Sequence, residues 1–264
     1  YGTQAALAAW RMLFFRPGDF VPDPARSDEW NRGAYLVRGP GHCDACHASR
    51  NALGAVSHEL DLGGGLIPMQ NWYAPPLVSA RGDGAANWDA ADLEALLKTG
   101  VSPRGAAMGP MAEVVYRSTQ HLSDADVRAI AVFLRSFAAP APARARAAVP
   151  PAEPDVLARG ERIYGDHCAD CHGRHGTGQP PAYPALAGNS SVTGDIAANA
   201  IKAVLFGGYA PSTASHPRPY GMPPFFHVLK DADVAAVLTY VRTSWGRGAP
   251  PVSTADVERY RDVR

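Results

Sequence analysis

Two segments of the chain share one pattern of hydrophobic and polar positions. Residues 122–130 (LSDADVRAI) recur as residues 229–237 (LKDADVAAV), and the likeness continues for several residues beyond each copy. In both copies the apolar residues recur at helical spacing, and Ser123 with Asp126 three residues later has the form of a capping box. The pattern predicts two equivalent helices, one in each half of the chain.

Capping and stop residues predict further helices between these two. Asp89 can cap a helix that runs to Lys98 and is ended by Gly100. Another helix is predicted to begin near Thr193 and to end at the glycine pair 207–208. No alternating pattern typical of strands stands out, so the expected fold class is all-α.

The N-terminal stretch 5–15 is apolar except for Arg11. It is too short to cross a bilayer, and no run of eighteen or more apolar residues occurs in the chain, so no transmembrane helix is predicted. We expect an amphipathic helix that packs on a partner domain rather than a membrane anchor.

The repeat also extends upstream and divides the chain into two units. The sequence RGAY at 32–35 corresponds to RGERIY at 159–164, and an Ala/Pro-rich spacer lies between the copies. A chain of 264 residues is long enough for two ordinary domains. The predicted organisation is an N-terminal arm or interdomain helix (1–26), a first domain (27–139), a Pro/Ala-rich linker (140–153) and a second domain (154–264).

All four cysteines lie in two Cys-x-x-Cys-His runs. This pattern is typical of c-type haem attachment, in which two thiols bond the porphyrin vinyl groups and the histidine ligates the iron. On a helical turn, residues at i, i+3 and i+4 share one face, which suits this chemistry. The sequence therefore predicts two covalent haem c groups, one held by Cys43, Cys46 and His47 and the other by Cys168, Cys171 and His172.

Three other uses of paired cysteines fit less well. A four-sulfur zinc site usually has its pairs closer in sequence, and these pairs lie at 43–46 and 168–171. A thioredoxin-like redox motif expects a βαβ neighbourhood, which the pattern does not indicate. Disulfides are the third alternative in an exported chain. None of the three requires the adjacent histidine.

The glycine run at 63–65 lacks the strand and helix context of a nucleotide site.

An electron-transfer haem needs a second axial ligand, and methionine sulfur is the usual one in small cytochromes. In the second unit the candidate is Met222, which prolines on both sides hold in an extended segment. In the first unit we favour Met111, which follows Gly-Pro and opens a helical pattern. Met108 is the reserve candidate, and Met69 is expected to serve packing.

Histidine is the competing ligand. Seven histidines lie outside the two motifs: His42, His58, His121, His167, His175, His216 and His227. Downstream of each motif lies a proline, Pro75 or Pro184, whose carbonyl could accept the other imidazole N–H and fix the ring. Ordinary loop prolines are the alternative. Residues that could contact a porphyrin edge or propionate are Trp72, Tyr73, Tyr183 and Arg50.

Charge is balanced, with 25 basic and 25 acidic residues, so nothing indicates nucleic-acid binding or a polybasic membrane patch. Charged residues make up only 19% of the chain, while 26 glycines and 24 prolines predict many loops wrapped around a cofactor. No export signal is visible. Because haem attachment to this motif takes place outside the bacterial cytoplasmic membrane, we expect a periplasmic protein or one on the outer face of that membrane.

With NRGAYLV at 31–37, the first cysteine motif and GPMAEVV at 109–115, the chain resembles the multihaem cytochrome c subunits of bacterial membrane-associated dehydrogenases that oxidise alcohols, aldehydes or gluconate. The likeness covers nearly the whole chain. The resemblance implies tandem cytochrome c-like domains, Met111 as the first sixth ligand and Met222 in the last haem domain. Such subunits commonly carry three haem domains, so we expect that a first domain is missing or was never present.

The function predicted from these features is electron transfer by a dihaem cytochrome. Its donor would be a dehydrogenase catalytic subunit, and its acceptor an oxidase, a quinone site or another cytochrome. The alternatives are a peroxidase-like dihaem enzyme and a haem-based sensor, each of which needs an iron with an open position. Both units have a candidate methionine, so we expect an electron-transfer subunit and not an enzyme.

Overall fold

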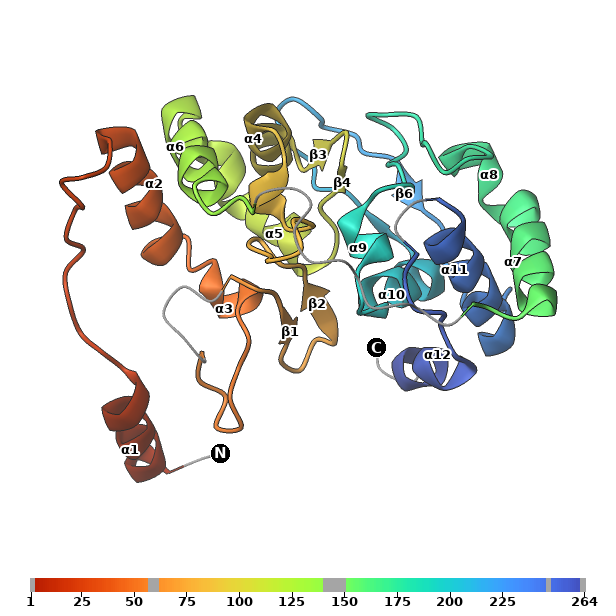
Figure 1. Ribbon diagram of the computed structural model, residues 1–264, viewed down its shortest axis with the longest axis horizontal. Coiled ribbons are helices and arrows are strands. Elements are labelled where there is room, and N and C mark those ends of the chain that lie inside the picture. Colours follow the sequence, from red (N-terminus) through yellow and green to blue (C-terminus); the bar gives the residue numbers. More distant parts are fainter. Residues whose placement is uncertain (1–2, 57–61, 140–150, 246–247, 262–264) are drawn as a thin grey trace.

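The computed structural model describes residues 3–56, 62–139, 151–245 and 248–261. Below, the first half means the described residues up to 139 and the second half those from 151 onward. The fold is mostly helical, as predicted, and several long loops connect its helices (Figure 1). The longer helices of the first half are α1 (Gln4–Phe14), α2 (Asp28–Arg38), α4 (Ala90–Thr99), α5 (Pro110–Arg117) and α6 (Asp124–Arg135). Those of the second half are α7 (Pro154–His167), α10 (Ala198–Phe206), α11 (Asp231–Ser244) and α12 (Thr254–Arg261).

Three short antiparallel strand pairs accompany the helices, and the sequence did not predict them. They are β1 (Gly65–Ile67) with β2 (Trp72–Ala74), β3 (Val101–Ser102) with β4 (Gly105–Ala106), and β5 (Gly208–Tyr209) with β6 (Gly221–Met222). Strands of two or three residues are too short to leave an alternating pattern.

One helix pair is repeated in the two halves. Helix α2 packs against α6, and α7 packs against α11 in the same way (Figure 1). A glycine lies at each crossing, in close contact with the backbone of the partner helix. A Cβ added to Gly33 would lie 2.0 Å from the carbonyl oxygen of Ala129, and one added to Gly160 would lie 2.2 Å from that of Ala236. The shared RG sequence therefore marks the two points where helices meet backbone to backbone.

The arginine before each of these glycines pairs with an aspartate of the partner helix. Arg32 Nε lies 2.7 Å from Asp126 Oδ1, and Arg159 Nη2 lies 2.7 Å from Asp233 Oδ1. The repeated motif LxDAD thus supplies the acid of each ion pair. In the first half Ser123 caps α6 by accepting a hydrogen bond from the N–H of Asp126, as the capping box predicts.

Each half has its own cluster of buried apolar side chains. In the first half it lies chiefly between α2 and α6 and includes Val37 and Phe133. In the second half it joins α7, α10, α11 and α12, and includes Leu205, Val234 and Val257. Helix α12, which the sequence pattern did not reveal, belongs to this second cluster.

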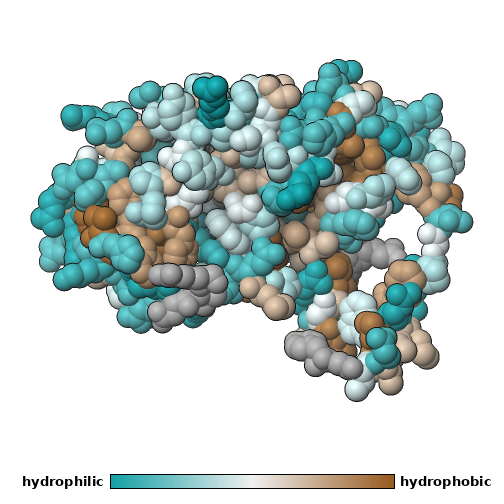
Figure 2. Space-filling view, turned by 180° about the vertical axis from the view of Figure 1, so that it is seen from behind, coloured by the Kyte–Doolittle hydropathy of each residue, from teal (hydrophilic) through white to brown (hydrophobic). Residues whose placement is uncertain are grey.

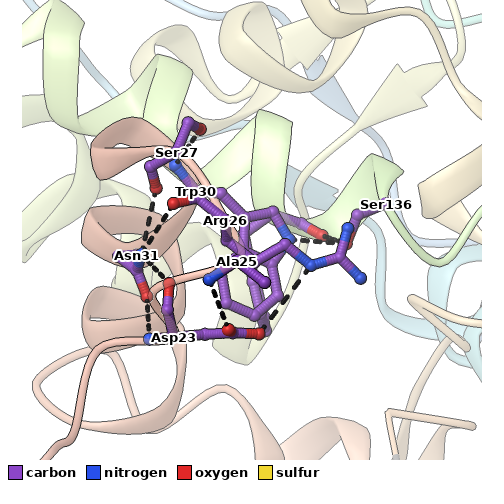
Figure 3. A network of polar contacts seen from close by, with 8 residues as sticks. Asp23, Ala25, Arg26, Ser27, Trp30, Asn31 and Ser136 are labelled. Carbon is purple, nitrogen blue, oxygen red and sulfur yellow. Dashed lines mark hydrogen bonds and ion pairs between the residues drawn. The ribbon is translucent and has the colours of Figure 1, made fainter.

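A polar network fixes the entry into α2 (Figure 3). The buried side chain of Asn31 accepts from the N–H of Asp23 at 2.7 Å and donates to the Asp23 carbonyl at 2.9 Å. Next to it, Trp30 Nε1–H donates to Ser136 Oγ at 2.9 Å. The loop before α2 is thereby tied to α2, and α2 is tied to the C-terminal end of α6.

The predicted caps agree with the structure, with one difference. Asp89 is the N-cap of α4 and Gly100, at φ 76°, is its C-cap. The helix expected to begin near Thr193 instead begins at Ala198, because Asn189 caps a separate single turn, α9 (Ser190–Thr193). Helix α10 then ends at Gly207, as expected.

Helix α1 is confirmed as a helix but lies apart from the other helices (Figure 1). Hydrophobic side chains are visible on its surface in Figure 2, at the lower right, and Met12 is 79% exposed. Trp10 Nε1–H donates to the carbonyl of Leu53 at 2.9 Å. That its apolar face packs on a partner domain stays a prediction. Within the described part of the chain, every helix is too short or too polar to cross a bilayer.

The Arg32–Asp126 pair gives the first half a dependence on acid pH. The hydrogen bond from Arg32 lowers the pKa of Asp126 from its ordinary value, so the pair stabilises the folded state fully above about pH 4 and less as the pH falls through the folded pKa. Because Arg32 is half exposed, the contribution should be about 0.5 kcal/mol. We expect Asp126→Asn to lose that amount at neutral pH and to flatten the decline in unfolding free energy toward pH 2, measured by urea titration at each pH. An unchanged pH profile in the variant would contradict this.

Candidate haem-attachment sites

The first cysteine motif forms one helical turn a few residues after the end of α2. This turn, α3 (Asp44–His47), begins after Cys43, and the backbone N–H of His47 donates to the Cys43 carbonyl at 2.9 Å. Cys43, Cys46 and His47 therefore lie on one short turn, all partly buried, and both cysteines are free thiols. This is the local geometry that attachment of one flat ring through two thiols and one imidazole requires.

The imidazole of His47 is oriented by the backbone of a distant loop. Its Nδ1–H donates to the carbonyl oxygen of Pro75 at 2.7 Å, which leaves Nε2 as the nitrogen free to bind a metal. Burial lowers the pKa of His47, although the bond to Pro75 opposes that shift. The ring is thus held in the neutral form, which is the form that ligates iron.

The second motif repeats this arrangement. Its turn, α8 (Ala169–His172), follows α7 directly, and His172 Nδ1–H donates to the Pro184 carbonyl at 2.9 Å. Burial again lowers the pKa of the histidine. The prediction that one proline carbonyl orients each imidazole is confirmed in both halves.

The surroundings of Cys43 and Cys168 suit thioether bonds better than a zinc site. Burial raises the pKa of Cys43 to about 11 and that of Cys168 to about 11, which disfavours the thiolate that zinc would need. A thioether carries no charge and so loses nothing by burial. No three His, Cys, Asp or Glu side chains of the described residues come together as a metal cluster, and all four cysteines are free. The described residues therefore give no support to a four-sulfur zinc site that joins the two cysteine pairs.

The hairpin β1–β2 braces the first motif, a feature the sequence did not reveal. The N–H of Gly64 donates to the His47 carbonyl at 2.9 Å, and a Cβ on Gly65 would lie 2.3 Å from the Ala48 carbonyl oxygen. After β2 the chain reaches Pro75. The residues that flank the hairpin therefore hold His47 at two points. Gly64, just before β1, bonds its backbone carbonyl, and Pro75, just after β2, bonds its imidazole ring. The glycine run at 63–65 was the available signal, since only glycine permits this approach.

Met222 lies in β6, partly buried, where its backbone pairs with Gly208 of β5. A Cβ on Gly207 would lie 2.2 Å from the Met222 carbonyl oxygen, so the end of α10 packs tightly on this strand. The predicted extended conformation is confirmed. Its role as an iron ligand stays a prediction.

The methionines of the first half lie in different surroundings. Met111 is partly buried in the first turn of α5, after Gly109, which packs on the ring of Trp72. The methyl of Met108 lies against Gly208 of the second half, 2.8 Å from where a Cβ of that glycine would be. Met69 is 98% exposed in the β1–β2 turn, so the expectation that it serves packing is wrong.

Of the residues expected near a porphyrin edge, Arg50 and Tyr183 each touch a cysteine motif. Arg50 donates to the carbonyls of Gly54 at 2.7 Å and Ala45 at 2.6 Å, and so fixes the loop after α3. The ring of Trp72 lies beneath the Lys202 ammonium, 5.0 Å from its centroid. Tyr183 packs on Tyr220 at 5.4 Å and is hydrogen-bonded to Cys171 of the second motif. Of the competing histidines, His58 lies outside the described residues.

Comparisons with known proteins agree with this chemistry. The family model described as Cytochrome c matches residues 157–245. The chain is 36% identical to the cytochrome c subunit of a quinone alcohol dehydrogenase from Gluconacetobacter polyoxogenes, over 97% of this chain and 58% of that protein. It is 35% identical to the cytochrome c subunit of gluconate 2-dehydrogenase from Pantoea cypripedii, over 94% of this chain and 60% of that protein.

A smaller relative is covered almost entirely. Cytochrome c-552 of Thermus thermophilus is 32% identical over 39% of this chain and 85% of its own length. By contrast, the chain spans less than two thirds of the length of the dehydrogenase subunits. The resemblance to cytochrome c subunits of dehydrogenases is confirmed, and these names agree with the expectation that the chain is not itself the catalytic enzyme.

Proposed function

This chain belongs to the cytochrome c family, and we propose that it holds two covalently bound haem c groups and passes electrons, one at a time, from a dehydrogenase to a respiratory acceptor. The observation that carries the proposal is one arrangement present twice. In each half a single helical turn brings two free thiols beside an imidazole whose Nδ1–H is bound by a proline carbonyl. When bound, each haem would supply the one-electron redox couple.

We propose the axial pairs His47 with Met111 and His172 with Met222. Support for Met222 comes from its partly buried position on a strand held against the end of α10. Support for Met111 over Met108 comes from the direction of the Met108 methyl, which lies against Gly208 of the other half. A methionine opposite a neutral histidine stabilises the reduced iron and so raises the reduction potential.

The domain boundaries follow from the same repeat. We assign the first haem domain to 27–139 and the second to 154–264, with 1–26 as an arm and 140–153 as the linker. The separate apolar clusters of the two halves support this division. Residues 140–150 of the linker lie outside the described part of the chain.

The names of the relatives suggest the partners. Two of them are cytochrome c subunits of a quinone alcohol dehydrogenase and of gluconate 2-dehydrogenase. We infer a dehydrogenase catalytic subunit as donor and an oxidase, a quinone site or another cytochrome as acceptor. We place the protein in the periplasm or on the outer face of the cytoplasmic membrane, because haem is attached to this motif there.

Mass spectrometry of the whole chain tests the haem assignment. We expect a mass increased by two haem groups, and by only one in Cys43→Ser/Cys46→Ser or in Cys168→Ser/Cys171→Ser, because each pair of thiols holds its own ring. An unmodified chain would overturn the proposal.

Carbon monoxide added to the reduced protein tests the function. An electron carrier with two filled iron positions should bind little, whereas a peroxidase-like enzyme or a sensor should bind at one haem. Ready binding at either haem would contradict the proposed pairs of axial ligands.

A further inference from the structure

Helix α10 of the second half holds the edge of the β1–β2 hairpin of the first half. The Asn199 side chain meets both backbone groups of Tyr73: its Oδ1 accepts from the Tyr73 N–H at 2.9 Å, and its Nδ2 donates to the Tyr73 carbonyl at 2.7 Å. An edge strand has free backbone groups on its outer side, and Asn199 satisfies them as a neighbouring strand would. This contact crosses 126 residues of sequence.

Lys202, nearly one turn further along α10, fixes the other end of the hairpin. Its ammonium donates to the Gln70 carbonyl at 2.8 Å and lies 5.0 Å from the centroid of the Trp72 ring. Lys202 is only 9% exposed, and burial lowers its pKa. No ion pair involving it is present among the described residues. The ammonium group thus contacts the Gln70 carbonyl and the Trp72 ring, both of which belong to the hairpin, so Lys202 stabilises the position of the hairpin.

The hairpin held in this way is also the support of His47. Gly64, just before β1, donates to the His47 carbonyl at 2.9 Å, and Pro75, just after β2, accepts from its ring at 2.7 Å. Tyr73 is only two residues before Pro75. A displacement of β2 at Tyr73 would therefore be transmitted to the carbonyl that orients the imidazole.

We propose that Asn199 is a positioning residue for the first haem, acting from the other half of the chain. Asn199 holds the backbone of Tyr73, and Tyr73 in turn fixes the position of the Pro75 carbonyl. That carbonyl accepts the Nδ1–H of His47. A histidine that donates this bond is a more basic ligand and favours oxidised iron. Losing the bond should therefore raise the reduction potential of the first haem and leave that of the second unchanged. The inference rests on the proposed function, because it requires a haem at His47.

The test is Asn199→Leu, which keeps a similar shape but can make neither hydrogen bond. The whole chain with both haems is titrated in a spectroelectrochemical cell. The two steps are assigned by comparison with Met222→Ala, which should move the step of the second haem. We expect Asn199→Leu to shift the first haem's step to higher potential only.

The matched control is Gln120→Leu. Gln120 also bonds across the two halves, since its Oε1 accepts from the Ala214 N–H at 3.3 Å, but it does not touch the hairpin. Neither step should move in this variant. The inference is overturned if Asn199→Leu leaves the first step in place, or if it moves both steps alike as general loosening would. If mass spectrometry finds no haem on the first motif, the proposed function has failed instead.

Discussion

Replacing Gly160 with alanine is expected to lower the free energy of unfolding by about 3 kcal/mol. A Cβ at this position would lie 2.2 Å from the carbonyl oxygen of Ala236 and 2.8 Å from Cβ of Tyr240. Neither atom is the end of a flexible side chain, so α7 would have to move away from α11. That movement would open the buried cluster that contains Ile163 and Val237. Denaturant titration of the haem-bound chain, followed by far-ultraviolet circular dichroism, measures the loss.

The matched control is Gly165→Ala, five residues later on the same helix. A Cβ there meets nothing within 4 Å, so alanine should stabilise the chain by up to about 1 kcal/mol through its higher helix propensity. Both substitutions replace a glycine of α7 with alanine. They differ only in the surroundings of the new methyl group, which would clash with α11 at position 160 and has open space at position 165. Equal stability of the two variants would show that α7 and α11 do not cross as closely as described.

The helices that could be predicted are those whose signals are local. Ser123 caps α6 through its side chain as the sequence indicates, Asp89 stands at the predicted N-cap position of α4 without a side-chain capping bond, and Gly100 ends α4 in the left-handed conformation. The start of α10 was placed near Thr193, which instead ends the separate turn α9. The true start could not be located, because its N-cap residue, Ala197, has no polar side chain and so gives no capping signal.

The haem motifs were also predictable from the fixed spacing of their cysteines and histidine, and the two proline partners from a Pro-x-Leu sequence downstream of each motif. The contacts that join the halves were not. Asn199 gives no local sign of a partner, and Tyr73 reads as an ordinary aromatic residue until the fold brings the two together. The same holds for Met108 and Gly208. Such pairs are determined by tertiary packing between segments far apart in sequence, on which local periodicity carries no information.

Replacing Met222 with alanine should change the redox behaviour of the second haem most strongly. If its sulfur is the sixth ligand, the variant loses the weak long-wavelength absorption band that an iron–sulfur bond gives to oxidised haem. The potential should fall by a sizeable part of the roughly 0.8 V over which axial ligands set haem potentials. The reduced variant should also bind carbon monoxide at one haem. A redox titration and a carbon monoxide titration measure the two effects.

Met69→Ala is the control, because Met69 is 98% exposed and its removal should leave the band, both potentials and the carbon monoxide response unchanged. In the Met222→Ala background the remaining band should belong to the first haem. Adding Met111→Ala should then abolish it, whereas adding Met108→Ala should preserve it, because the Met108 methyl lies against Gly208 of the other half. Retention of the full band in Met222→Ala would show that another group, such as a histidine, completes the second iron site. If the remaining band is lost on adding Met108→Ala rather than Met111→Ala, Met108 and not Met111 is the sixth ligand of the first haem.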